Sequence, residues 1–308
     1  MSAAAHDREV IRLPAPPRLA DSYRAALRGT LPAAAGRTGG GDVPAVTLAH
    51  TARADVATLT AYQHLLGLPA TDSLPAGYVH VLGFPLAMTL MTRRDFPLPV
   101  LGLVHLANRV VQRRPLHLGE DLDLAAWADG LRPHRRGTVV DVHLVARAGD
   151  DVAWEGTSTY LAKGRSPGGT AAAGEAGPRA GAGADADAEA QSAAAGPGQH
   201  VWRLGADIGR RYATVTGDRN PIHTSRAGAR LFGFPRPIAH GMYTAARALA
   251  ELPHPGGAFE WTAEFAKPVL LPGTVVLRFG PYGGGWSYVA RSRSGKPHLQ
   301  GHVRPTDS

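Results

Sequence analysis

Residues 212–223 read YATVTGDRNPIH, and they are the most informative part of this chain. A carboxylate, Asp218, and an imidazole, His223, stand five residues apart on either side of a rigid turn made by Asn220 and Pro221. Carboxylates and imidazoles are the groups that proteins most often use as general acids and bases. An isolated Asp more often caps a turn and an isolated His more often satisfies nearby backbone groups, so the ordered string matters more than either residue.

A second string, IAHGM at residues 238–242, follows downstream, with its His240 seventeen residues after His223. It leads into an apolar, alanine-rich run that predicts a helix over residues 240–252 with Gly241 at its opening. The first backbone N–H groups of a helix are unpaired and the dipole there is positive. The N–H of Gly241 is therefore a candidate donor to an oxygen that becomes negatively charged in a reaction.

The two strings together resemble the signature of the MaoC-like, or (R)-specific enoyl-CoA hydratase (hydratase 2), family of hot-dog-fold proteins. The resemblance runs from the aromatic Tyr212 through Gly217-Asp218, one free position and Asn220-Pro-Ile-His223 to the small Ala229. The downstream Ala-His-Gly-Met string adds to it. A match of this length is a specific signal, which a bare Asp and His at the same spacing would not be.

The resemblance implies that Asp218 and His223 hold a water molecule, with His223 as the base and Asp218 as the proton donor to C2, or with both groups sharing both roles. Asn220 would orient them, and the Gly241 N–H would stabilise the enolate oxygen. The expected activity is that of a (3R)-hydroxyacyl thioester dehydratase, or trans-2-enoyl-CoA (or enoyl-ACP) hydratase, in fatty-acid or related lipid metabolism. Its substrate would carry coenzyme A or the phosphopantetheine of an acyl carrier protein (ACP), with no other cofactor and no metal.

Substrate-binding candidates lie close to these strings in sequence. His240, Met242 and Thr244 border the helix opening, although His240 is more often a structural support, and Thr244 is followed by alanines where the family often has Ser or Thr. The basic residues nearest the motifs are Arg230, Arg236 and Lys267, each of which is more often an ordinary surface charge. A basic rim of this kind would attract coenzyme A phosphates or an acidic carrier protein.

Composition narrows the alternatives. The chain has 308 residues, which is enough for two domains, and it has no Cys, which excludes disulfides, thiolate nucleophiles and zinc–cysteine sites. The formal charge is +8, but the basic residues are scattered and no nucleic-acid-binding motif is present. No apolar run is long enough to span a membrane and residues 1–10 do not resemble a secretory signal, so a cytoplasmic protein is expected.

An internal repeat organises the chain. Residues 200–308 form the copy with the signature: a helix, a strand near 259–266 with Lys267-Pro268, and strands near 274–279 and 286–292. Residues 44–163 form a matching copy with a helix-like run at 84–91, a strand at 103–111 with Arg114-Pro115, and strands at 121–127, 138–146 and 152–161. The Gly/Ala-rich stretch 164–199 is expected to be a disordered linker, and 1–43 is an N-terminal segment without an assigned function.

A helix followed by antiparallel strands, repeated twice, predicts an α+β double hot-dog fold in which the two sheets pair edge to edge. The first copy lacks the signature, which predicts one active site per chain. Its small and apolar helix residues are candidates for an acyl pocket, although apolar helix faces are more often core; they are Gly83, Ala87, Leu90 and Met91.

Two alternatives remain open at this point. A hot-dog acyl-CoA thioesterase would use a carboxylate to activate water against the thioester carbonyl and would not need the Asn-Pro-Ile-His string. A non-catalytic acyl-thioester-binding subunit would keep the fold without needing Asp218. A degenerate first copy allows a monomer, while open sheet edges allow a homodimer.

Overall fold

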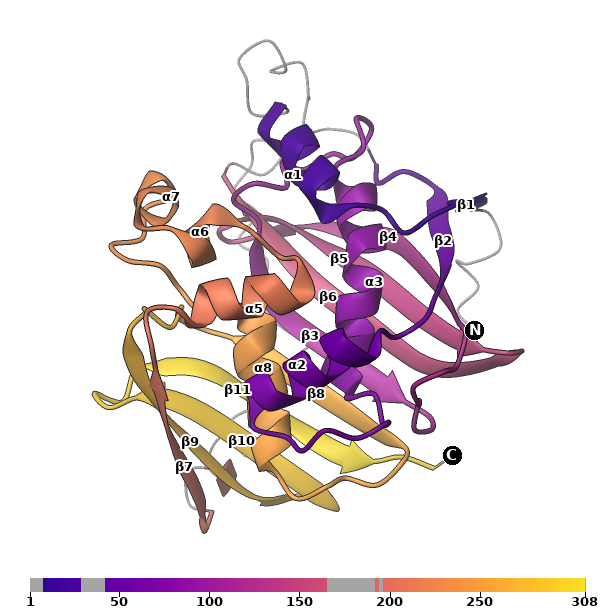
Figure 1. The fold of residues 1–308 in the computed structure, drawn as a ribbon. Coiled ribbons are helices and arrows are strands. Elements are labelled where there is room, and N and C mark those ends of the chain that lie inside the picture. Colours follow the sequence, from indigo (N-terminus) through magenta and orange to yellow (C-terminus); the bar gives the residue numbers. More distant parts are fainter. Residues whose placement is uncertain (1–7, 29–41, 165–191, 194–195, 308) are drawn as a thin grey trace.

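The computed structural model describes residues 8–28, 42–164, 192–193 and 196–307. Its strands form one sheet in the order β1-β2-β4-β5-β6-β3-β8-β11-β10-β9-β7 (Figure 1). The strands are β1 (Glu9–Arg12), β2 (Val46–Ala52), β3 (Val104–Gln112), β4 (Leu122–His134), β5 (Gly137–Ala148), β6 (Asp151–Lys163), β7 (Gly198–Leu204), β8 (Phe259–Phe265), β9 (Gly273–Tyr282), β10 (Gly285–Ser292) and β11 (Pro297–Pro305). The helices are α1 (Leu19–Arg28), α2 (Val56–Leu66), α3 (Ala76–Met91), α5 (Ile208–Thr216), α6 (Pro221–Thr224), α7 (Arg226–Leu231) and α8 (Gly241–Glu251).

The two halves of the sheet have the same topology. The first half runs β2-β4-β5-β6-β3 and the second runs β7-β9-β10-β11-β8, so each strand of one half has a counterpart in the other. Helix α3 packs against the first half and α8 against the second, as Figure 1 shows. The predicted α+β double hot-dog fold and its internal repeat are confirmed.

The halves join where two equivalent strands meet. Strands β3 and β8 pair antiparallel from Ala107 opposite Glu264 to Gln112 opposite Phe259, so neither strand is left as an open edge. Val110 and Trp261 face each other across this seam, and both are fully buried. The Trp261 indole N–H donates to the hydroxyl of Tyr288 at 3.0 Å, which ties the seam to the interior of the second half.

Equivalent positions in the two copies show which polar residues the first copy lacks. Helices α2 and α5 both end at a glycine with φ near 77°, Gly67 and Gly217, a left-handed conformation that favours glycine. The residue after Gly67 is Leu68, whereas the residue after Gly217 is Asp218. Likewise the residue before α3 is Pro75, whereas the residue before α8 is His240. An apolar residue and a proline therefore occupy the places of the two polar groups.

The N-terminal segment is part of the fold. Strand β1 pairs parallel with β2, and α1 packs on α3, with Leu19, Ser22 and Ala26 of α1 buried at helical spacing. Ser22 and Thr89 hydroxyls lie 3.4 Å apart across this contact. The amphipathic spacing in α1 is visible in the sequence, but nothing in the sequence indicates which surface the helix covers.

Several predicted bounds differ from the structure. The first central helix begins at Ala76 and not near Phe84, because it continues through His80, Gly83 and Pro85, which interrupt the apolar pattern but lie inside a helix that is buried along most of its length. The final strand β11 was not predicted.

The predicted linker, residues 164–199, also extends too far toward the C-terminus. Strand β7 pairs with β9 from Gly198 onward, and the Ser192 hydroxyl donates to the carbonyl of Pro281. Most of the predicted linker, residues 165–191 and 194–195, lies outside the described residues.

The burial of the β3–β8 pairing predicts that the same substitution, Val to Ala, changes the free energy of unfolding much more at this pairing than at an exposed edge strand. Val110→Ala removes two methyl groups from a fully buried site and should lower the free energy of unfolding by about 2 kcal/mol. Val201→Ala, on edge strand β7 where Val201 is 48% exposed, should change it by less than about 0.5 kcal/mol. Denaturant unfolding of both variants checks this; equal effects would show that the seam does not carry the stability assigned to it.

Candidate active site

The signature residues are brought together by two consecutive turns. Gly217 ends α5, and Asp218 follows directly in the connection to the short helix α6. Asn220 caps α6: its side-chain oxygen accepts from the backbone N–H of Ile222 at 3.3 Å, and its own backbone N–H donates to Asp218 Oδ1 at 3.3 Å. Asn220 thus contacts both the turn and the carboxylate, and its role in orienting the reacting groups stays a prediction.

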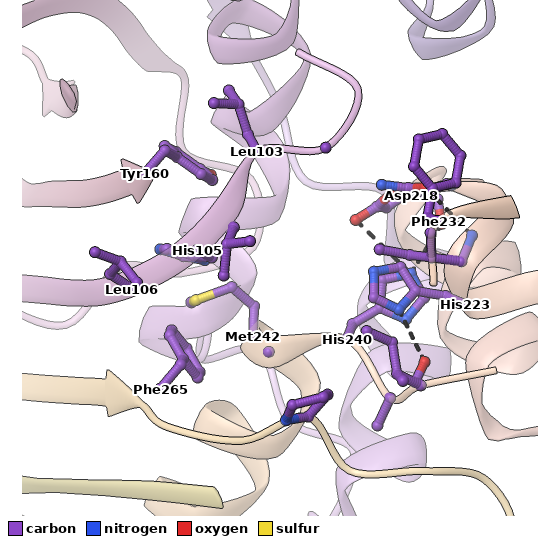
Figure 2. Close-up of a pocket in the computed structure, with 18 of the residues that line it drawn as sticks. Leu103, His105, Leu106, Tyr160, Asp218, His223, Phe232, His240, Met242 and Phe265 are labelled. Carbon is purple, nitrogen blue, oxygen red and sulfur yellow. Dashed lines mark hydrogen bonds and ion pairs between the residues drawn. The ribbon is translucent and has the colours of Figure 1, made fainter. Parts of the chain in front are cut away.

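Two imidazoles stack beside this carboxylate. His223 Nδ1 donates to the carbonyl of Ile238 at 2.8 Å, so its proton lies on Nδ1 and Nε2 keeps a lone pair. His240 Nε2 donates to the backbone carbonyl of Asp218 at 3.0 Å and lies 3.7 Å from the carboxylate oxygen Oδ2. The two rings lie 3.7 Å apart between centroids with 27° between their planes (Figure 2).

Burial sets the charge states of this cluster. It lowers the pKa of His223 to about 3, helped by the neighbouring His240 and opposed by Asp218. Burial also lowers the pKa of His240. Burial alone would raise the pKa of Asp218, but the adjacent His240 and His223 and a hydrogen bond from Tyr23 hold it below its usual value. At neutral pH the cluster therefore contains a carboxylate and two uncharged imidazoles, one of which, His223, is an available base.

A cavity of about 670 Å³ lies between the two halves and includes this cluster. In Figure 2, Asp218, His223 and His240 come from one side, while Leu103, His105, Leu106 and Tyr160 of the first half come from the other. Met242 lies between the two groups, and Phe265 lies beside His105, with 4.8 Å between the ring centroids. Helix α3 adds a face of the cavity through Phe84, Met88 and Met91, at the spacing of one helical face.

The opening of α8 lies in the same cavity. Gly241 lines it beside Phe265, and a Cβ at this glycine would lie 3.1 Å from the Phe265 ring, so a side chain here would crowd the cavity. The hydroxyl of Thr244 donates to the carbonyl of Gly241 at 2.7 Å. Thr244 lines the cavity as predicted, but its hydroxyl proton is already used by the helix backbone.

The predicted basic residues divide into two groups. Lys267 lines the cavity, but Arg230 and Arg236 are exposed and do not, so their selection by closeness in sequence was misleading. Instead, Arg136 and Lys163 of the first half line the cavity, together with His298. Sequence reasoning missed these because they follow no motif and reach the cavity only through the pairing of the halves.

The acyl-pocket candidates on the first central helix divide in the same way. Met91 lines the cavity, whereas Gly83, Ala87 and Leu90 do not, and these three pack in the core. A Cβ at Gly83 would lie 2.1 Å from the side chain of Leu144, so this glycine allows α3 to approach β5 closely. The residues that sequence reasoning missed include a polar set inside the cavity, namely Tyr23, His80, His105 and Tyr160.

Asp218, His223 and His240 could also be considered as metal ligands, because one potential ligand atom of each lies within 4.8 Å of the others. Imidazole lone pairs lie in the plane of the ring, however, and two stacked rings do not direct them toward one ion. The geometry suits proton transfer better than metal coordination.

A double hot-dog fold with one acid/base pair beside a helix N-terminus, facing a cavity between its halves, defines a class of single-site enzymes built from a duplicated domain. Residues 199–283 match the MaoC like domain family. The chain is 39% identical over 253 residues to 3-hydroxyacyl-thioester dehydratase X of Mycobacterium tuberculosis. The aligned region covers 81% of this chain and 85% of that protein. This chain belongs to the MaoC-like dehydratase family.

Solved structures agree with this assignment. The crystal structure of HtdX from Mycobacterium tuberculosis has a TM-score of 0.70 and 35% identity, over 84% of this chain and 100% of that chain. A MaoC-like dehydratase from Phytophthora capsici has a TM-score of 0.66 over 85% of this chain and 95% of that one. At 18% identity, the second similarity supports the fold alone.

The buried imidazoles predict acid sensitivity. Burial lowers the pKa of His105 to about 3 from an ordinary 6.5, so the unfolded chain binds a proton here that the folded protein does not. This contribution to stability is complete above about pH 6.5 and is lost as the pH falls toward 3. We expect His105→Phe to reduce the loss of stability between pH 7 and 5, measured by denaturant midpoints. The matched change His64→Phe, at an exposed histidine, should not.

Proposed function

We propose that this protein is a 3-hydroxyacyl-thioester dehydratase that also catalyses the reverse reaction, hydration of trans-2-enoyl thioesters, in fatty-acid or related lipid metabolism. The observation that carries the proposal is the half-buried pair of Asp218 and His223, with the His223 Nε2 lone pair and the Gly241 helix opening in one largely apolar cavity. Membership of the MaoC-like dehydratase family supports it.

The chemistry needs a base, an acid and a polarised carbonyl. In hydration, a water held by His223 and Asp218 transfers a proton to this pair as its oxygen bonds to C3. The electron pair of the C2=C3 bond moves toward the thioester carbonyl, whose oxygen accepts a hydrogen bond from the Gly241 N–H at the positive end of α8. The pair then delivers a proton to C2, so one water is added across one face of the double bond. Dehydration follows the same steps in reverse.

The degenerate half supplies the acyl site in this proposal. Phe84, Met88 and Met91 of α3 offer flexible apolar side chains beside Leu103 and Leu106 of the first half. A cavity of about 670 Å³ is of the size typical of small-molecule sites. The loss of the first active site thus leaves room for the acyl chain of the substrate of the second.

The phosphate-bearing part of the substrate has a matching set of cations. Arg136, Lys163 and Lys267 converge on the cavity from the two halves, and all three are exposed at its rim. Guanidinium and ammonium groups bind phosphates by charge and hydrogen bonds. We therefore infer that the rim binds coenzyme A or the phosphopantetheine of an acyl carrier protein. A cytoplasmic location and a monomer or homodimer remain predictions; among the described residues no helix is long and apolar enough to cross a membrane.

The first test is hydration of short and long trans-2-enoyl-CoA by the purified protein, followed as loss of the conjugated thioester absorbance. Asp218→Asn and His223→Gln should each lower kcat/KM by roughly 10²–10⁴-fold, because each removes one member of the acid/base pair. Asp207→Asn is the matched control: Asp207 precedes α5, is half exposed and makes no side-chain cap hydrogen bond, so activity should be unchanged.

Two outcomes would contradict the proposal. Release of free thiol without loss of the double bond would identify a thioesterase. Tight binding of enoyl thioesters with no turnover, and no effect of Asp218→Asn, would indicate a non-catalytic binding subunit. Enoyl thioesters on a carrier protein are assayed in parallel, so that a preference for this carrier is not mistaken for inactivity.

The rim predicts a separate effect on affinity. Lys267→Glu should raise KM for an enoyl-CoA by about three- to tenfold while kcat changes little, because the residue lies at the rim and not at the reacting atoms. Lys296→Glu reverses an equally exposed charge that does not line the cavity, and it should leave KM unchanged. An equal rise in both variants would mean that the effect is one of overall charge.

A further inference from the structure

Tyr23 connects the N-terminal segment to the active site. Its hydroxyl donates a hydrogen bond to Asp218 Oδ1, and its side chain lines the cavity. Tyr23 belongs to α1, which precedes both hot-dog copies. The contact joins residues 195 positions apart, so it exists only in the folded chain.

Helix α1 is held where this contact requires it. Leu19, one turn before Tyr23, packs against the start of the catalytic turn: a Cβ at Gly217 would lie 2.9 Å from the Leu19 side chain. On the neighbouring face, Ser22 and Ala26 are buried against α3. The helix therefore bridges the central helix of the first half and the turn that carries Asp218.

We propose that Tyr23 is a positioning residue for Asp218, and that the N-terminal segment is a third component of the active site beside the two hot-dog copies. This rests on the proposed dehydratase function. The phenol donates to Oδ1, which also accepts from the Asn220 backbone N–H, so two donors hold one carboxylate oxygen. The other oxygen, Oδ2, faces His240 at 3.7 Å and is left to act on water and substrate.

The hydrogen bond also affects the charge of the carboxylate. A donor to an ionised carboxylate favours its charged form, and the Tyr23 hydroxyl contributes to the lowered pKa of Asp218. Burial and the adjacent Asp218 raise the pKa of Tyr23 well above its usual value, so the phenol stays a donor at neutral pH. The titratable side chains that face Asp218 come from every surrounding element: Tyr23 on α1, His80 on α3, Tyr160 on β6, Tyr212 on α5, His223 on α6 and His240 before α8.

Tyr23→Phe tests the proposal, because it removes the hydroxyl and keeps the ring. We expect kcat for enoyl-CoA hydration to fall about ten- to hundredfold, the value of a hydrogen bond to a charged group, with KM changed less than about threefold. The acid limb of the pH profile of kcat/KM should move to higher pH, because Asp218 would protonate more readily. A role limited to packing would not move this limb.

Ser22→Ala is the matched control, since it weakens the docking of α1 on α3 without touching Asp218. It should leave kcat and the pH profile unchanged. An unchanged or higher kcat in Tyr23→Phe, with an unmoved acid limb, would overturn the proposal; a higher kcat would mean that the tyrosine obstructs the carboxylate. An equal loss in Ser22→Ala and Tyr23→Phe would reduce the role of the phenol to holding α1 in place.

A measurement independent of turnover separates this proposal from the function itself. Carbon-13 NMR of aspartate carboxyl groups, with the Asp218 signal assigned by its absence in Asp218→Asn, reports the titration of this group directly. Tyr23→Phe should shift it to higher pH. If the native protein hydrates no enoyl thioester but this shift is observed, the proposed function fails and the Tyr23 contact stands. If hydration is observed but the titration of Asp218 does not move, the proposed function stands and the positioning role of Tyr23 fails.

Discussion

The antiparallel pairing of β3 with β8 is the constraint on which the rest of the structure depends. It joins two sheets of identical topology through equivalent strands, and it buries Val110 and Trp261 between them. The same pairing places the cavity between the halves, so that no single copy contains the whole site. Because the polar residues of the second copy already face the first copy across this cavity, the first copy can lose its own polar residues without leaving the site incomplete.

The two halves contribute different kinds of side chain to the cavity. The second half supplies a carboxylate, two imidazoles and a helix N-terminus, while the first supplies apolar side chains, the buried His80 and the half-buried His105. Burial keeps these imidazoles uncharged at neutral pH, lowering the pKa of His80 to about 4, whereas Asp218 stays ionised beside them. A water-poor surrounding of this kind strengthens the interactions that act on developing enolate charge.

A half-buried carboxylate is stabilised by hydrogen-bond donors, and those of Asp218 come from two parts of the chain. Asn220 contributes one backbone N–H to Oδ1, and Tyr23 from α1 contributes a second donor. The N-terminal segment thus completes the surroundings of Asp218, which gives a physical reason for a helix that belongs to neither hot-dog copy.

The sequence by itself determined the family, the repeat and the central pair. The ordered string from Tyr212 to His223 required Asp218 and His223 to share one short turn, and hydrophobic periodicity was enough to place most strands, the second central helix and the C-terminal half of the first. These features depend on residues that are close together in the sequence, so the sequence pattern is enough to identify them. Only the tertiary structure decided what lies opposite them: that Arg136 and Lys163 reach the cavity and Arg230 and Arg236 do not, that Met91 lines the cavity while Leu90 packs in the core, and that Tyr23 binds Asp218. Contacts across the seam depend on which faces meet when two sheets pair, and no spacing within one segment encodes that.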